Sequence, residues 1–281
     1  KRQTSRHKRI NALFRSFLAV SRKSEILTKS YFCLTYFCFY LNKLKAMNLR
    51  KSKLLHLPVD PIGVILAVII ILIWCLSLFF LLQWEVDYSN PLTYLAILIQ
   101  AHLYTGLFIT SHDAMHGTVS GNKGLNRLLG RITAMLFAFN SYDRLIKKHH
   151  MHHRHVATHE DPDYHESGKF WRWYWNFLKN YITLKQFVFM SISYQLLKLV
   201  VPADNLILFW ILPSILSTFQ LFYFGTYLTH KEGHDNQNKH SSRTLKKNHA
   251  WAFFSCYFFG YHYEHHDAPG VPWWRLWQTK A

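Results

Sequence analysis

The sequence predicts an all-α integral membrane protein with about four transmembrane helices and a histidine-rich cap on the cytoplasmic side. Two observations lead to this prediction. Hydrophobic residues make up 50% of the 281 residues and are gathered in long blocks, as is typical of membrane-spanning helices. The 19 histidines are also clustered, and three clusters near the block ends repeat the i, i+3 or i, i+4 spacing of one helix face.

Positive charge is concentrated at the N-terminal end of the chain. The net charge is +18, and residues 1–59 hold 14 Lys or Arg against a single acid, Glu25. A basic end like this could bind nucleic acid, but beside a hydrophobic span it is more typical of the cytoplasmic flank of a membrane helix. We therefore expect membrane lipid as a partner and no nucleic acid.

Residues 1–46 are basic and irregular, and the first methionine is Met47. The one aromatic run in this segment, 31–41, is too short to span a bilayer. No small-residue cleavage site of a signal peptide follows it. We interpret 1–46 as a basic extension outside the functional unit, and 47–281 as the membrane domain.

Four blocks are the expected membrane spans. Residues 62–84 contain no charge and would extend about 34 Å as a helix at ~1.5 Å per residue. After the acidic loop 85–90, residues 91–110 form the return span. The segment 182–201 is a weaker apolar span, and 206–228 is the last one despite an internal proline.

The connecting segments complete the expected topology. Residues 125–146 mix apolar and basic positions and predict a helix lying at the membrane surface. Residues 170–177 form an aromatic belt of the kind found at the depth of the lipid headgroups. With four spans, the two outer loops 85–90 and 201–205 carry no Lys or Arg, in agreement with the positive-inside rule. All three histidine clusters then lie on the cytoplasmic face of a multi-pass protein.

The histidine clusters are candidate metal-binding faces, because neutral imidazole is the commonest protein metal ligand. The clusters are HDAMH at 112–116, KKHHMHHRH at 147–155 and HYEHH at 262–266. In the middle run, His150 and His155 fall outside the shared helical spacing. A further histidine ends the last span. The candidate ligands are therefore His112, His116, His149, His152, His153, His230, His262, His265 and His266.

Eight or nine nitrogen ligands exceed the three or four of a single zinc site and suit two metal ions. No HExxH or Glu-x-x-His motif is present, which argues against a zinc protease and a soluble carboxylate di-iron site. We therefore expect a histidine-rich di-iron cap that activates dioxygen. Adventitious metal binding or metal transport is the alternative, although a transporter would place its ligands within the spans.

Four stretches resemble a known family, the β-carotene ketolases of the membrane fatty-acid desaturase/hydroxylase superfamily. They are HDAMHG (112–117), HHMHHRH with DPDYH (149–165), FYFGTYLTHK (222–231) and YHYEHHDAPGVPWW (261–274). The resemblance covers about residues 50–281. The histidine boxes alone are typical of the whole superfamily, whereas HDAMHG and the PWW ending favour the ketolases. Thr229 stands where the family favours proline.

The resemblance implies an oxygenase that introduces a 4-keto group into the β-ionone rings of a carotenoid taken from the bilayer. Two hydroxylations at one carbon and loss of water would convert β-carotene to echinenone and then to canthaxanthin. It implies two iron ions, O2 and a reduced ferredoxin-type electron donor. The segment 47–281 is then a membrane di-iron oxygenase domain. A carotenoid hydroxylase or an acyl-lipid desaturase of the same superfamily is the nearest alternative.

Three aspartates near the clusters are candidate catalytic residues. Asp113 lies within the first cluster, on a different helix face from its histidines, so it either supports a ligand or is a solvated or helix-positioning acid. Asp161 and Asp163 flank Pro162, where forming a turn competes with a hydrogen bond to a ligand histidine.

Overall fold

The computed structural model describes residues 61–231, 238–245 and 248–279, together with five residues between positions 39 and 49. The chain divides into two units, Lys1–Lys53 and Leu54–Ala281, and the description below concerns the second. The predicted basic extension, 1–46, lies almost wholly outside the described residues.

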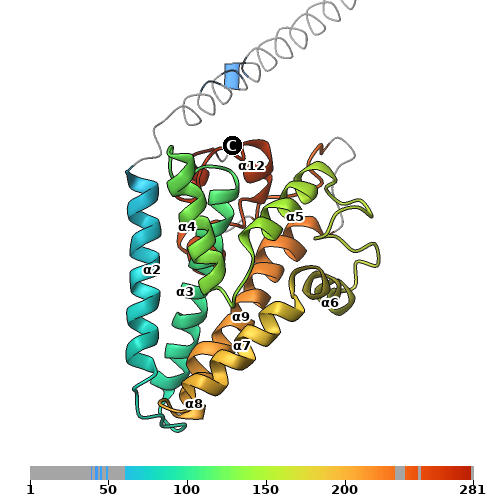
Figure 1. The fold of residues 1–281 in the computed structure, drawn as a ribbon. Coiled ribbons are helices and arrows are strands. Elements are labelled where there is room, and N and C mark those ends of the chain that lie inside the picture. The colour runs from blue at the N-terminus through green and yellow to red at the C-terminus, as the bar shows by residue number, and fades with distance from the viewer. Residues whose placement is uncertain are drawn as a thin grey trace, which may run out of the picture. The chain divides into compact units, whose positions relative to one another are not determined.

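Three helices are long and apolar enough to cross a membrane (Figure 1). The first is α2, Ile62–Leu81, and the second is α3, Pro91–Met115, which Asn90 caps by accepting a hydrogen bond from the Leu92 amide. The third, Ala203–His230, is called the third membrane helix here. It consists of α8 (Ala203–Leu206), η1 (Ile207–Ile211), α9 (Leu212–Gln220), η2 (Leu221–Tyr227) and α10 (Leu228–His230).

The third membrane helix contains two π-helical segments, η1 before Pro213 and η2 close to its C-terminal end. Proline lacks the N–H that an α-helix needs, and wider π turns accommodate such interruptions. The helix therefore crosses without a break, as the sequence predicts for 206–228.

The weaker span predicted over 182–201 is not among these three helices. This segment forms α7, Leu184–Leu197, whose 14 residues correspond to only about 21 Å at ~1.5 Å per residue. The chain after α7 nevertheless reaches the C-terminal end of α2. This is shown by the Asn205 side chain of α8, which donates to the carbonyls of Leu81 and Trp84 at 2.8 and 2.7 Å. In Figure 1, α7 runs obliquely towards α8.

The prediction of a single surface helix over 125–146 was wrong, because two helices occupy this stretch. They are α4, Lys123–Leu136, and α5, Tyr142–Arg154. Ala138 and Phe139 separate them with φ angles of 52° and 55°, a left-handed conformation that non-glycine residues rarely adopt. A Cβ at Gly130 would stand 2.5 Å from the Tyr142 ring and 2.8 Å from the Ala114 side chain, so glycine allows α4 to pack closely.

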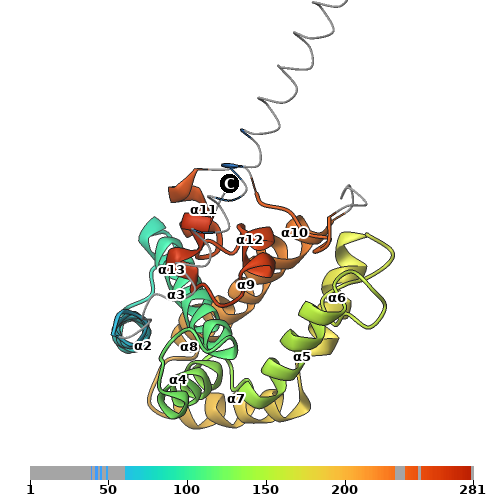
Figure 2. The ribbon, with the colours of Figure 1, turned by 90° about the horizontal axis from the view of Figure 1, so that it is seen from above.

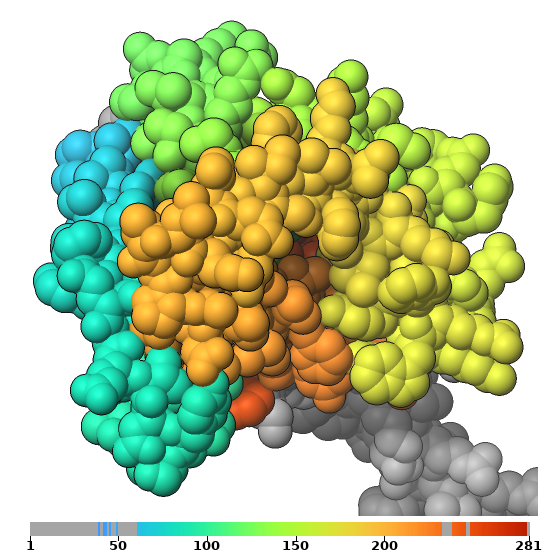
Figure 3. All heavy atoms as spheres, turned by 60° about the horizontal axis from the view of Figure 1, so that its bottom comes forward, coloured from blue at the N-terminus to red at the C-terminus, as the bar shows by residue number. Residues whose placement is uncertain are grey.

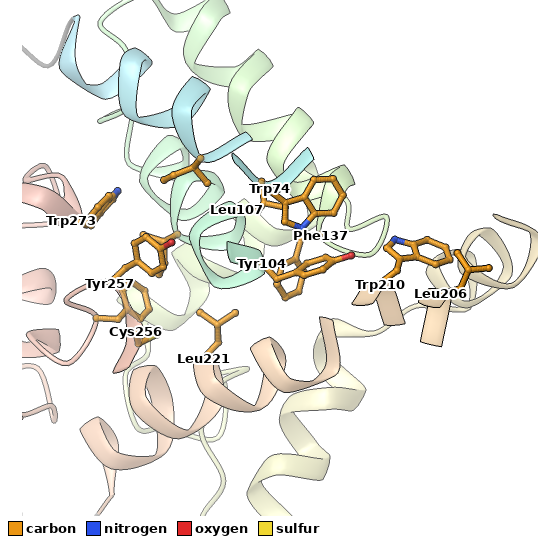
Figure 4. Packing of buried hydrophobic residues seen from close by; sticks show 13 residues of the cluster. Trp74, Tyr104, Leu107, Phe137, Leu206, Trp210, Leu221, Cys256, Tyr257 and Trp273 are labelled. Carbon is orange, nitrogen blue, oxygen red and sulfur yellow. The ribbon is translucent and has the colours of Figure 1, made fainter. Parts of the chain in front are cut away.

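Aromatic side chains hold the membrane helices together (Figure 4). The Trp74 ring of α2 meets the Tyr104 ring of α3 edge-on at 5.2 Å between centroids, and Tyr104 meets Phe137 at 5.8 Å. Such edge-to-face pairs add stability beyond the burial of area. The same cluster includes Tyr257 and Trp273, so the C-terminal segment packs against the membrane helices.

The short C-terminal helices lie at the end of the molecule where α3 and the third membrane helix finish (Figure 1). The helix α6 stands apart from them at one side in the view from above (Figure 2). The helix α6 carries the predicted aromatic belt and buries Trp173 and Phe177 while exposing Trp171 and Trp175. The C-terminal segment consists of short helices. These elements are α6 (Phe170–Tyr181), α11 (His249–Cys256), α12 (His262–Asp267), α13 (Trp273–Leu276) and η3 (Trp277–Thr279).

Candidate metal centre

The predicted ligand histidines come from four separate helices and meet at one end of the fold. Two groups of four have ligand atoms within 4.8 Å of one another. The first histidine group is His112, His116, His149 and His265, and the second histidine group is His152, His230, His262 and His266. Each group combines residues from α5 and α12 with residues from the end of a membrane helix.

In the first histidine group, the ring nitrogens face one another across the group. His116 Nε2 lies 2.6 Å from His149 Nε2, and the His112 and His149 ring centroids are 4.4 Å apart. His112 Nε2 is buried and has no hydrogen-bond partner among the described residues. A buried nitrogen without a partner is costly, and a cation between the rings would remove that cost.

The second histidine group repeats this arrangement. His266 Nε2 lies 3.1 Å from His152 Nε2 and 3.0 Å from His262 Nε2. All four of its members are buried.

His153 belongs to neither group of four but lies between them. Its Nε2 is 3.0 Å from His265 Nε2 in the first group, and its ring centroid is 4.3 Å from that of His266 in the second. It can therefore complete a fifth position at one of two neighbouring metals.

The protonation states of these imidazoles suit metal binding. Burial and neighbouring histidines lower the pKa of His149, His262, His265 and His266, and burial lowers the pKa of His116 to about 3. A neutral imidazole has one unprotonated nitrogen that can bind a metal. In each histidine group, several such nitrogens converge on one point. The two groups therefore fit two bound cations and do not fit an ordinary hydrogen-bonded core.

Asp161 holds His152 from behind. Its two carboxylate oxygens lie 2.9 and 3.1 Å from His152 Nδ1, and they also accept from the backbone amides of Asp163 and Ala157. Asp161 therefore both forms the turn and accepts a hydrogen bond from His152, so the two roles that the sequence left as alternatives occur at once. Burial alone would lower the pKa of His152, but Asp163 and Asp161 outweigh it and raise that pKa.

Asp163 lies beside this contact and is tied to α6. The Tyr181 hydroxyl and the Trp173 indole N–H donate to the side chain and the carbonyl of Asp163, respectively. The nearer carboxylate oxygen lies 3.9 Å from His152 Nδ1. Burial raises the pKa of Asp163 to about 6.

Asp113 is buried, which excludes the solvated acid that was one of the alternatives for this position. One oxygen accepts from the Trp273 amide at 2.9 Å, and the other lies 3.4 Å from His112 Nδ1. The aspartate thus links the end of α3 to the C-terminal PWW segment.

The sequence did not reveal two other polar contacts of this centre. His230 Nδ1 donates to the Ser241 carbonyl at 2.8 Å, and Tyr181 reaches Asp163 from the end of the aromatic helix α6. A backbone carbonyl leaves no signal in the sequence, and Tyr181 follows the predicted aromatic belt 170–177 without a motif of its own. His150 is exposed, and His155 Nδ1 pairs with Glu160 at 2.7 Å.

Thr229, the one departure from the resembled motif, lies in α10 next to His230. Its hydroxyl donates to the Gly225 carbonyl at 2.8 Å. Helical geometry beside His230 is therefore kept without a proline.

A small pocket of about 40 Å³ opens onto the centre. Its wall includes His112, His149, His152 and His262 beside apolar side chains. Gly225 forms part of this wall, and a Cβ there would stand 2.6 Å from the Phe259 ring. A small apolar group can thus approach the histidines directly.

Comparison with known proteins gives consistent matches. Residues 89–205 and 187–281 match the sequence model of the family described as Fatty acid desaturase. The chain is 37% identical over 219 residues to a protein named Beta-carotene ketolase from Paracoccus sp. (strain PC1), covering 75% of this chain and 89% of that protein.

Two algal relatives are similar over comparable lengths. A Zeaxanthin 4-ketolase of Chlamydomonas reinhardtii is 38% identical over 231 residues, covering 76% of this chain and 52% of its own length. A Beta-carotene 4-ketolase 3 of Haematococcus lacustris is 39% identical over 202 residues, covering 67% of this chain and 62% of its own length. The chain therefore spans only part of the algal proteins.

Proposed function

The chain belongs to the fatty acid desaturase family, and we propose that it is a β-carotene ketolase that introduces a 4-keto group into β-ionone rings. One observation carries the proposal: two four-histidine groups border a small, mostly apolar pocket, in a chain whose relatives are named carotenoid ketolases. The substrate is then a carotenoid dissolved in the bilayer.

Two iron ions are the metals proposed for the histidine groups. The nine ligands would be the eight histidines of the two groups and His153, which lies close to both. Iron bound by imidazole with an open position can react with dioxygen. Bound there, the pair would supply the dioxygen activation needed to insert oxygen into an unactivated C–H bond.

The reaction at ring carbon 4 converts CH2 to C=O. Each hydroxylation takes up O2, two electrons and two protons, places one oxygen atom on the carbon and releases the other as water. The second hydroxylation gives a geminal diol, which loses water to leave the ketone. The electrons require a reduced donor, which we propose to be a ferredoxin-type protein. Oxidation of one ring gives echinenone, and oxidation of both gives canthaxanthin.

The three aspartates support the ligand histidines in this proposal. Asp161 accepts from His152 Nδ1, which keeps the Nδ1 proton on that side and directs Nε2 into the second histidine group. Asp163 stands behind Asp161 and is held by Tyr181. Asp113 joins the first histidine group to the PWW segment through the Trp273 amide.

We place the metal centre on the cytoplasmic face, because the loop 82–90 at the opposite end carries no Lys or Arg. The chain then crosses the bilayer four times, with α7 and the turn after it completing the crossing that the three long helices leave open. A membrane-impermeant thiol reagent tests this placement. In intact cells it should label Ser89→Cys and spare Ser167→Cys; the reverse pattern would place the centre outside.

Pigment analysis tests the proposed activity. The full chain is expressed in bacteria that accumulate β-carotene, and the extracted carotenoids are separated. We expect echinenone and canthaxanthin, together with about two iron atoms per chain in the purified protein. The matched control is His149→Ala in the same host.

The alternatives give different outcomes in this experiment. Zeaxanthin without ketones would indicate a carotenoid hydroxylase, and altered acyl chains with unchanged carotenoid would indicate a desaturase. Unchanged pigments and lipids with full metal content would favour a membrane protein that only binds or transports metal.

A further inference from the structure

A larger apolar cavity of about 420 Å³ lies beside the small pocket at the metal centre. Side chains of α3, α5, α6, α7 and the third membrane helix form its wall together with the turn between α4 and α5, and most of that wall is apolar. A cavity of this size is at the lower end of the ~300–1,000 Å³ that hold small ligands in proteins.

The cavity and the small pocket share part of their walls. The shared residues are Phe108, Leu145, Phe177, Tyr181 and Leu221. Beyond these residues the small pocket is bounded by His112, His149, His152 and His262. A ligand in the cavity therefore has one end directed at the metal centre, and Tyr181 touches both that end and Asp163.

The other end of the cavity opens between α7 and α9. Phe187 of α7 and Ile215 of α9 belong to the wall yet are 68% and 54% exposed. Figure 3 shows this face hollowed, with a recess between the yellow-to-gold atoms of the α6–α7 region and the orange atoms of the third membrane helix. Large exposed apolar side chains at this depth suit contact with lipid tails.

The helix α7 forms one side of this opening and is largely exposed, since Gln186 is its single buried residue. A capping box anchors its first turn: Thr183 accepts from the Gln186 amide, and the Gln186 side chain accepts from the Thr183 amide. Beyond that turn, Met190, Tyr194 and Leu197 are only partly buried where they pack against the core cluster.

We propose that this cavity binds one ring end of a carotenoid with the adjoining part of its polyene, and that the molecule enters sideways from the lipid between α7 and α9. This inference rests on the proposed ketolase function and identifies where its substrate lies. Because the cavity is at the small end of the usual range, it holds only part of a forty-carbon molecule. The second ring remains in the lipid, so the two rings react in separate binding events.

Two substitutions at the mouth of the cavity test the proposal. Ser191→Trp on α7 and Ile215→Trp on α9 place an indole in the opening from opposite sides. Ile192→Trp is the matched control, because Ile192 is next to Ser191 and 51% exposed but does not line the cavity. Each full-length protein is purified in lipid nanodiscs with β-carotene. Retained carotenoid and iron content are measured per chain, and ketone formation is measured after addition of O2 and a reduced ferredoxin-type donor.

We expect the two mouth variants to retain at least about tenfold less carotenoid and to form correspondingly less ketone, because an indole fills space that the ring needs. Their iron content should equal that of the unchanged protein, and Ile192→Trp should behave normally in all three measurements. Normal carotenoid retention in both iron-loaded mouth variants would overturn the proposal.

The same measurements separate this proposal from the proposed function. Carotenoid that is retained by the unchanged protein and lost from the mouth variants, with no ketone formed, would support the cavity and refute the ketolase. Ketone formation that is normal in every variant would support the ketolase and refute the cavity. If one mouth variant loses its iron and fails to fold, the other still decides.

Discussion

The two histidine groups are similar in composition but differ in what holds their imidazoles. In the second histidine group, His152 Nδ1 donates to Asp161 at 2.9 Å and His230 Nδ1 donates to Ser241 at 2.8 Å. In the first, the one such contact among the described residues is His112 with Asp113 at 3.4 Å, which is long for a hydrogen bond.

The groups also differ in exposure. All members of the second histidine group are buried, whereas His116 of the first is partly exposed. Partners behind a ligand fix its orientation and its tautomer, and raise its affinity for metal. The two proposed metals should therefore not be equivalent: the second group should hold its metal more tightly, and the first should exchange it more readily.

The largest effect should come from removing one ligand of either group. His149→Ala and His262→Ala should each lose about one iron per chain, and ketone formation should fall by more than the ~100-fold that loss of an outer partner can cost. Iron analysis and pigment extraction measure both. His150→Ala is the control, because this neighbouring side chain is exposed. Full activity in either ligand variant would remove that group from the centre.

His153 lies between the groups, and its removal tests whether they work together. We expect His153→Ala to abolish ketone formation and to reduce iron content by no more than one atom per chain, because its ring contacts both groups. Retained full activity would show that His153 is not a ligand.

Asp161→Asn tests the support behind the second group. The amide keeps the shape of the side chain and removes its charge from His152, so metal affinity in this group should fall about 10–100-fold. Asp113→Asn is the matched change in the first group, where the longer contact predicts a smaller loss. Competition with a chelator measures both affinities, and a larger loss for Asp113→Asn would reverse the comparison.

Metal removal should separate the groups in time. A chelator added to the purified protein should release iron in two phases, the faster one from the first group because its histidines are less supported. Asp161→Asn should speed the slow phase only. Release in a single phase, unchanged by this variant, would mean that the two sites are equivalent.

The smallest effect should come from deleting the basic extension. A protein consisting of residues 47–281 should form ketones and bind iron like the full chain, because every group of the proposed centre lies beyond residue 111. The same expression host and pigment analysis measure this. Loss of ketone formation with normal membrane insertion would assign the extension a role in activity.

Features that depend on local spacing could be predicted from the sequence. An uncharged block longer than a bilayer predicts α2, and the i, i+3, i+4 pattern on α5 and α12 predicts which histidines face together. Proximity to the block ends also predicted that all three clusters would meet. These features are local because a helix fixes the relative direction of side chains a few residues apart.

Features that depend on packing between distant segments could not be predicted from the sequence. The left-handed turn at Ala138 and Phe139 has no glycine to announce it, and α7 is shorter than its apolar sequence suggests. The pairing of His152 with Asp161, the support of Asp163 by Tyr181 and the apolar cavity all join segments that helical spacing does not relate. A cavity in particular is the space that packed helices leave unfilled, and no stretch of sequence encodes it alone.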